Sequence, residues 1–151
     1  MNEPLAYPLI SLTKKYLSFF AKETLALKID RYHYILMLID DNHENLTQKA
    51  IGDLLHLDKS YMVNIIDYLS SNGYVFREKN PIDRRQQLIR LTDLARQDVP
   101  FIKNVYSELN KKSFNNLSRA EIDIFNKVIA VIQDNLADSQ PNEIHLEIKK
   151  K

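Results

Sequence analysis

Apolar residues recur at helical spacing over the first part of the chain. From about residue 9 to residue 28 they lie three or four positions apart, which predicts one amphipathic helix. A second helix follows, and Asp30 is its expected N-cap because a short carboxylate can accept a hydrogen bond from an unpaired backbone N–H group. The polar stretch 40–45 ends this second helix.

Two shorter helices are predicted in the middle of the chain. Thr47 is expected to cap the first of them, and Asp58 or Ser60 the second. The second helix spans about residues 58–72 and is followed by Gly73, which suits the left-handed position after a helix. The side chains expected to face inward share i, i+3, i+4, i+7 spacing: Met62, Ile65, Ile66 and Leu69.

A β-hairpin is predicted directly after these helices. Residues 74–78 and 87–91 are β-prone and half apolar, and the polar run 79–85 between them forms a long tip. Because side chains alternate along a strand, Leu88 and Arg90 should face one side of the hairpin. Gln87, Ile89 and Leu91 should face the other.

The last third of the chain predicts two more helices and a tail. One helix begins near Thr92, and the other opens at a capping box formed by Ser118 and Glu121. Two apolar rows run along the last helix: Ile122, Phe125, Ile129, Ile132 and Leu136 in one, and Ile124, Val128 and Val131 in the other. A dimer contact explains the second row, and so does a central place in the core of one subunit. The tail, residues 139–151, is either an arm that adds to a partner or disordered.

Composition excludes several kinds of functional site. The length of 151 residues fits one domain, and the two isolated glycines exclude glycine-rich phosphate loops. The absence of cysteine excludes disulfides, thiolate metal sites and thiol nucleophiles. No nucleophile, base and orienting group cluster together, so we expect neither an enzyme nor a cofactor. No apolar run is long enough for a bilayer and the N-terminus lacks a basic start, so a cytoplasmic protein without membrane contact is expected.

The charge is concentrated in the predicted hairpin. The chain as a whole carries a net charge of +1, yet residues 77–90 hold five basic and two acidic side chains, a local charge of +3. Such a patch is consistent with a polyanionic partner, but on charge alone a solvated hairpin is the favoured interpretation. A short helix, a turn, a second helix and then a basic hairpin together form a winged helix-turn-helix. In that unit the second helix reads base edges in the major groove, and the hairpin, or wing, reaches phosphates and the minor groove.

The spacing of particular residues resembles the MarR family of transcriptional regulators. The resemblance lies in residues 64–69, in Gly73-Tyr74-Val75, in Asp83-Arg84-Arg85 after a gap of seven residues, and in Thr92 and Ala95. Residues 46–51 and 57–60 are also similar to segments of that family. The resemblance implies a single domain, mainly α-helical with a small β-hairpin wing. It implies helical dimerisation regions at 9–28 and 92–138, and a winged helix-turn-helix unit at 30–91.

The resemblance also implies a homodimeric repressor that binds pseudo-palindromic double-stranded DNA. Asn64 is suited to pair with an adenine edge and Val63 to touch a thymine methyl group. One of Arg84 and Arg85 is expected to enter the minor groove, and Arg85 is the first candidate. Asp83 is expected to restrain Arg85 by a charge-assisted hydrogen bond, or else to act purely as a structural clasp. The candidate DNA-binding residues are Thr47, Gln48, Lys59, Ser60, Tyr61, Val63, Asn64, Lys79, Asp83, Arg84 and Arg85.

Many relatives respond to small aromatic or phenolic acids held between the dimerisation helices and the winged unit. The residues that could line such a site here are Tyr16, Phe19, Phe20, Tyr32, His33 and Tyr106. Aromatic residues at helical spacing are more often plain core, and we favour that interpretation. The cluster Asp40, Asp41, His43 and Glu44 has possible metal ligands but the character of a solvated loop, so no metal site is predicted.

The sequence also allows a different function. A winged fold can serve as a protein-interaction module without DNA binding, and Tyr61 and Tyr68 would then form an apolar docking surface. Such a module has no need for Arg84 and Arg85 at the tip of the wing, so the charge favours DNA.

Overall fold

The protein is mainly helical, as expected, with one two-stranded antiparallel hairpin. The computed structural model describes residues 3–136. Its elements in chain order are α1 (Ala6–Glu23), α2 (His33–Asp41), α3 (Gln48–Leu55), α4 (Lys59–Ser71), β1 (Val75–Lys79), β2 (Gln87–Leu91), α5 (Asp93–Ser113) and α6 (Arg119–Asn135). The predicted tail lies outside the described residues.

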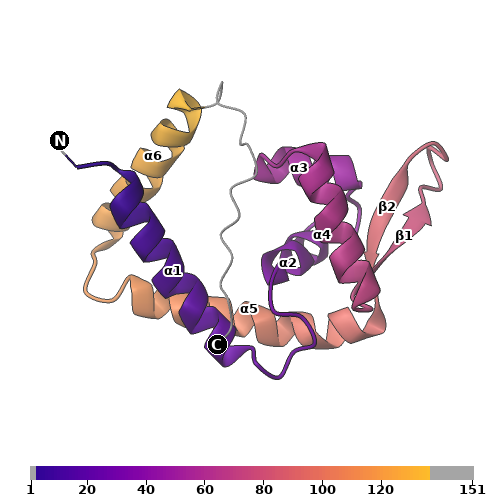
Figure 1. Ribbon diagram of the computed structural model, residues 1–151, viewed down its shortest axis with the longest axis horizontal. Coiled ribbons are helices and arrows are strands. Elements are labelled where there is room, and N and C mark those ends of the chain that lie inside the picture. The colour runs from indigo at the N-terminus through magenta and orange to yellow at the C-terminus, as the bar shows by residue number, and fades with distance from the viewer. Residues whose placement is uncertain (1–2, 137–151) are drawn as a thin grey trace.

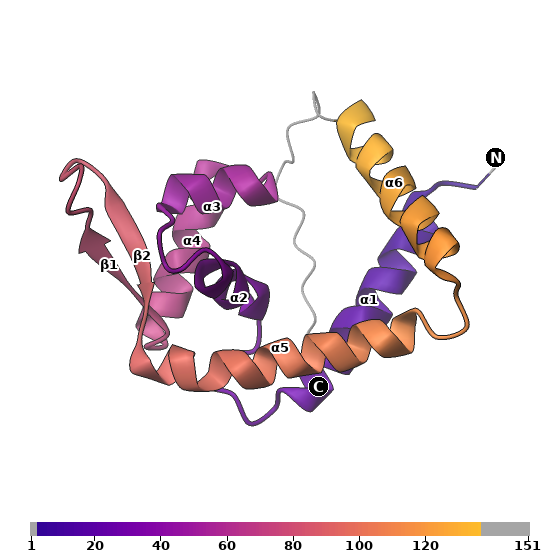
Figure 2. The ribbon, with the colours of Figure 1, turned by 180° about the vertical axis from the view of Figure 1, so that it is seen from behind.

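Helix α5 is the long element that joins the two halves of the fold. In Figure 1 it runs along the lower edge, with α2, α3, α4 and the hairpin above one end and α1 and α6 above the other. The reverse view in Figure 2 shows the same division, with the hairpin projecting from the outer side of the winged unit. None of the described helices is long and apolar enough to cross a bilayer.

Most helices begin at the residues that the capping rule predicts. Thr47, Asp58, Thr92 and Ser118 each accept a hydrogen bond from a backbone N–H group in the first turn, and Asp58 rather than Ser60 caps α4. Ser118 and Glu121 form the full capping box at the start of α6.

Helices α1 and α2 begin without a side-chain cap, and the prediction that Asp30 caps α2 is wrong. The residue before α2 is Tyr32, which has a left-handed backbone with φ 66° and makes no side-chain cap. The carboxylate of Asp30 instead accepts a hydrogen bond of 2.8 Å from the hydroxyl of Tyr68 on α4. The chain bends at Tyr32, and Asp30 contacts α4 rather than the first turn of α2.

Helix α1 is displaced toward the N-terminus relative to the predicted span 9–28. It starts at Ala6 because Pro8 falls in the first turn, where a missing N–H group costs nothing. It ends at Glu23, and the buried Thr24 donates from its hydroxyl to the carbonyl of Phe20 at 2.9 Å. The periodic apolar residues after Thr24 therefore belong to a loop.

The hairpin is buried at its base on both of its faces. Val75 pairs with Leu91 and Lys79 with Gln87, which sets the register. The backbone N–H of Ile89 donates to the carbonyl of Leu46 at 2.9 Å, so the segment before α3 lies along the outer edge of β2. Leu88 is consequently buried along with Ile89 and Leu91, although it faces the opposite side of the strand.

Helix α6 contributes nothing to the buried core. None of its residues is buried, and Ile124 and Val128 are 61% and 48% exposed. The interpretation of α6 as a central core helix of one subunit is therefore wrong. The core lies between α2, α4, the base of the hairpin and α5, with Phe20 of α1 at its margin.

Candidate nucleic-acid interface

Helix α4 has one apolar and one exposed polar face. Met62, Ile65, Ile66 and Leu69 are all buried, as the spacing predicts. Lys59, Ser60, Asn64 and Asp67 are exposed, and Tyr61 and Val63 are partly buried at the margin. The polar residues therefore share the face that a recognition helix presents to base edges and phosphates.

The turn between α3 and α4 is held tight by a close backbone approach. The N–H of Leu57 donates to the carbonyl of Gly52 at 2.9 Å, and Gly52 is buried. A Cβ atom at Gly52 would lie 3.3 Å from the carbonyl oxygen of Leu57 and 3.5 Å from Cγ of Met62. Glycine therefore allows α3 to pack closely against the turn and against α4.

The tip of the wing is an ordered turn built by two short polar side chains. Oδ1 of Asn80 accepts hydrogen bonds from the N–H groups of Ile82 and Asp83, at 2.9 and 3.4 Å. The Asp83 carboxylate accepts from the backbone N–H of Arg85 at 3.1 Å. Lys79, Arg84 and Arg85 project from this turn as exposed cations.

Asp83 holds the backbone of Arg85 more closely than it holds the guanidinium group. Nε of Arg85 lies 3.8 Å from Oδ1 of Asp83, which is an ion pair but too long for a hydrogen bond. The side chain of Arg85 is 96% exposed. The expected charge-assisted restraint is therefore wrong in its atoms, because a carboxylate two positions upstream reaches the backbone N–H more easily.

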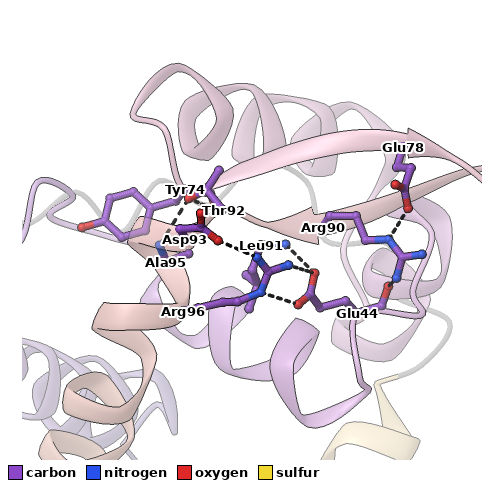
Figure 3. Close-up of polar contacts among 9 residues, drawn as sticks. All are labelled: Glu44, Tyr74, Glu78, Arg90, Leu91, Thr92, Asp93, Ala95 and Arg96. Carbon is purple, nitrogen blue, oxygen red and sulfur yellow. Dashed lines mark hydrogen bonds and ion pairs between the residues drawn. The ribbon is translucent and has the colours of Figure 1, made fainter.

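The base of the wing is fixed by Glu44, which precedes α3 (Figure 3). Its carboxylate accepts from Nε and Nη2 of Arg96 at 2.9 Å each, and from the N–H of Leu91 at 3.0 Å. Its carbonyl accepts from Arg90 at 2.7 Å, and Arg90 also donates to Glu78 across the hairpin at 2.6 Å. The hydrogen bonds to Glu44 raise the pKa of Arg96 above its ordinary value. One acidic residue thus joins the hairpin to the first turn of α5.

Arg77 on β1 makes a second connection, toward the helix-turn-helix. Its Nη2 donates to Oδ1 of Asp67 on α4 at 2.7 Å and to Oε1 of Gln48 on α3 at 3.1 Å. The sequence pattern assigned Arg77 and Arg90 only to the basic charge of the hairpin, and Glu44 only to a cluster of possible metal ligands. Their partners lie 10 to 52 positions away, so no local pattern indicates these contacts.

Thr47 and Gln48 lie at the N-terminus of α3, close to the wing. The hydroxyl oxygen of Thr47 is used as the helix cap, accepting from the N–H of Ala50 at 3.1 Å. Thr47 also pairs with Leu88 of β2 through its backbone.

The candidate effector residues do not form a single cluster. Four of them meet between α1, α2 and α5: the rings of Phe20 and Tyr106 are 4.1 Å apart, those of Phe20 and His33 are 4.9 Å apart, and Tyr16 stacks on Tyr106 at 6.5 Å. Burial raises the pKa of Tyr106, and ring nitrogen Nε2 of His33 lies 3.2 Å from the carbonyl of Ile29. Phe19 lies under Lys112.

Tyr32 belongs to a different aromatic group. Its ring packs edge-on against Tyr61 and Tyr68, at 6.4 and 5.6 Å. Tyr61 and Tyr68 are therefore half-buried in an internal contact. This packing weighs against the docking surface that a protein-interaction module would need.

The acidic residues at the end of α2 form ion pairs with α5. Nζ of Lys103 lies 2.6 Å from a carboxylate oxygen of Asp40 and 2.6 Å from one of Asp41. Glu44 is bound to Arg96. Within residues 3–136, no group of three or more His, Asp or Glu side chains is arranged to hold a metal ion.

Comparison with known sequences agrees with this geometry. The sequence profile of the MarR family matches residues 29–86, which span α2, α3, α4, β1 and the wing tip. The HTH-type transcriptional regulator SarZ of Staphylococcus aureus is 30% identical over 105 residues, covering 68% of this chain and 68% of that protein. This chain belongs to the MarR family.

Other transcriptional regulators are similar over most of their length. The HTH-type transcriptional regulator BilQ of Clostridioides difficile is 24% identical over 123 residues, covering 80% of this chain and 83% of BilQ. A putative MarR family transcriptional regulator from Listeria monocytogenes, crystallised with a 26-mer DNA, superposes with a TM-score of 0.78 at 19% identity. That superposition covers 94% of this chain and 99% of the other, so the winged helix-turn-helix fold is shared. This MarR-family chain is accordingly a transcriptional regulator and not an enzyme.

Proposed function

We propose that this MarR-family regulator is a cytoplasmic, sequence-specific repressor that binds double-stranded DNA as a homodimer. Helix α4 enters the major groove, and the wing, residues 79–85, enters the minor groove. The observation that carries the proposal is the joint placement of two surfaces. The exposed polar face of α4 is tied through Asp67 and Arg77 to the hairpin whose tip presents Arg84 and Arg85.

The contacts follow from the chemistry of each exposed group. Lys59, Ser60 and Tyr61 lie in the first turn of α4, where backbone N–H groups and the helix dipole favour a phosphate. Val63 and Asn64 lie one turn further along, at the level of the base edges. We expect Thr47 and Gln48 at the start of α3, and Lys79 on the wing, to contact phosphates on either side.

The dimer is supported by the apolar surface that one copy leaves exposed. On α6, Ile124, Phe125, Val128 and Val131 are each more than two-fifths exposed, and the apolar residues Leu9 and Leu12 of α1 are 40% and 50% exposed. A second copy that covers these helices places two α4 helices on one face. Such a dimer recognises a pseudo-palindromic site whose halves are about one helical turn, or 34–36 Å, apart.

Fluorescence anisotropy with duplexes from the region upstream of the protein's own gene tests DNA binding. We expect tight binding at low salt that weakens steeply as the salt concentration rises, because phosphate contacts release counterions. Arg85→Ala should lower the affinity about tenfold or more and reduce the salt slope by about one unit. Lys22→Ala on α1 is the matched control and should bind as the wild type does. Failure of the wild type to bind any duplex at low salt would overturn the proposal.

Relief of repression by a small aromatic acid is the finer part of the proposal. The cluster of Tyr16, Phe20, His33 and Tyr106 joins α1, α2 and α5, so a ligand there could change the angle between the dimerisation helices and the winged unit. Benzoate and salicylate are suitable probes, and binding should raise the melting temperature and lower the DNA affinity. If neither changes under saturating ligand, these four aromatic residues are plain core.

A further inference from the structure

Arg77 contacts one residue of α3 and one of α4 on the surface proposed above to face DNA. A single nitrogen, Nη2, donates to Asp67 on α4 at 2.7 Å and to Gln48 on α3 at 3.1 Å. Its side chain is 32% exposed, compared with 56% for Asp67. Arg77 therefore joins β1, α3 and α4 at one point.

Asp67 is an unfavourable residue for a helix that approaches DNA. It lies three positions after Asn64 and seven after Ser60, on the same exposed face of α4. A carboxylate on that face repels the phosphates, and a cation at 2.7 Å cancels most of this repulsion. Asp67 is acceptable on the recognition helix because Arg77 is beside it.

Gln48 gains an orientation from the same contact. Its side-chain amide has one accepting oxygen and one donating NH₂ group. Because Oε1 accepts from Arg77, the oxygen is turned toward the hairpin and the NH₂ group is left to point away from it. Phosphate oxygens only accept hydrogen bonds, so this orientation is the one in which Gln48 can bind the DNA backbone.

We propose that Arg77 is a positioning residue of the DNA interface. It neutralises Asp67 and turns Gln48 so that its NH₂ group donates to a phosphate, and it makes no contact with the phosphate itself. This inference rests on the proposed function, because it concerns how strongly the same surface binds DNA.

The test is a double-mutant cycle measured by anisotropy with the duplex that the wild type binds best. Arg77→Ala should weaken binding about tenfold, because it exposes a bare carboxylate to the phosphates and releases Gln48. Adding Asp67→Asn to Arg77→Ala should recover most of that loss. A residue with a merely structural role would give no such recovery, since the second substitution restores no packing or hydrogen bond to β1.

The part played by Gln48 has its own arm of the cycle. Gln48→Ala in the wild-type background should weaken binding severalfold, whereas the same change in the Arg77→Ala background should have little further effect. Lys111→Ala, which removes a cation from an exposed ion pair with Glu108 on α5, is the control for loss of one charge. Circular dichroism and thermal melting of each variant confirm that the fold is retained.

The outcomes separate the two proposals. Equal weakness of Arg77→Ala and Arg77→Ala/Asp67→Asn, with a salt slope reduced by about one unit in both, would mean that Arg77 binds a phosphate directly. Unchanged binding by Arg77→Ala would mean that it has no role in the interface. Either result overturns the inference and leaves the DNA-binding proposal standing, whereas a wild-type protein that binds no duplex overturns both.

Discussion

Gly73 connects the recognition helix to the wing through a single left-handed residue. Its φ is +78°, and a Cβ atom there would meet nothing within 4 Å, so any cost of substitution is conformational. The N–H of Gly73 and that of Tyr74 close the helix on the carbonyls of Ser70 and Leu69, both at 2.9 Å. The turn therefore depends on glycine for its backbone and not for space.

We expect Gly73→Ala to lower the free energy of unfolding by about 1–2 kcal/mol, the cost of a left-handed non-glycine residue. Urea denaturation followed by circular dichroism measures it. Gly73→Asn is the control, because asparagine tolerates the left-handed region better and should lose less. Equal stability of the alanine variant and the wild type would contradict the strain argument.

At the scale of residues, the rules for helix caps and for helical spacing predicted the features that depend on neighbours along the chain. The caps at Thr47, Asp58 and Ser118 and the buried side of α4 are correct, because each depends on neighbours within four positions. The roles of Glu44 and Arg77 could not be predicted, since their partners come from distant elements. The Asp83–Arg85 contact was predicted between the right residues but through the wrong atoms.

At the scale of elements, the wing is aligned by one carboxylate from another part of the chain. Glu44 binds the N–H of Leu91 at the end of β2 and the guanidinium of Arg96 in the first turn of α5. Its side chain is 18% exposed, so water competes weakly for these hydrogen bonds. Glu44 therefore connects the hairpin and α5 to the loop before α3.

Glu44→Ala should loosen the base of the wing. The amide of Leu91 should exchange its hydrogen about fivefold faster, since a lost hydrogen bond is worth about 1 kcal/mol. DNA affinity should fall as well, because the wing loses its fixed angle to α4. Amide exchange measured by NMR tests the first effect, and anisotropy the second. Asp93→Asn is the control, because Asp93 also pairs with Arg96 but is 95% exposed, and it should leave the exchange of Leu91 unchanged.

Element boundaries show where tertiary structure overrides the pattern. The apolar periodicity extended α1 to residue 28, yet the chain leaves the helix at Thr24 and the apolar residues continue into a loop that packs on the core. The predicted start of α2 was wrong because the carboxylate of Asp30 accepts a hydrogen bond from Tyr68 of α4 and does not cap the helix. The order of elements in the winged unit was predicted correctly, since its caps, glycine and hairpin are all encoded locally.

At the scale of the whole molecule, tyrosines limit stability at high pH. Burial raises the pKa of Tyr34 to about 12, and burial with a hydrogen bond to Tyr61 raises that of Tyr32 to about 12. Burial also raises the pKa of Tyr74, whose hydroxyl donates to Asp98 at 2.7 Å, and that of Tyr106. In each case the native state favours the neutral phenol more than the unfolded chain does.

These raised pKa values predict alkaline unfolding. Their stabilisation is complete below about pH 10, the pKa of an unfolded tyrosine, and is lost as the pH rises toward the native values. The free energy of unfolding should therefore decline from about pH 10 upward. Tyrosinate absorbance near 295 nm should rise together with the loss of helical circular dichroism. Full ionisation of all tyrosines while the helical signal persists would contradict the prediction.

We expect the exposed apolar face of α6 to be the dimer contact, so that one copy alone binds DNA incompletely. Val128 lies in the middle of this face and is 48% exposed, and a charge there would have to be buried if a second copy covers it. We expect the wild type to sediment as a dimer at micromolar concentration, and Val128→Glu to shift it toward monomer. The same variant should lose DNA affinity by more than tenfold, because one monomer binds a single half-site and loses the linked second contact.

Asn126→Glu is the control, because it places the same charge on the same helix but outside both apolar rows. It should leave both measurements unchanged. A wild type that sediments as a monomer, or a Val128→Glu variant that remains dimeric, would contradict this prediction. The apolar face of α6 would then bind some other partner, and the proposed pseudo-palindromic operator would lose its support.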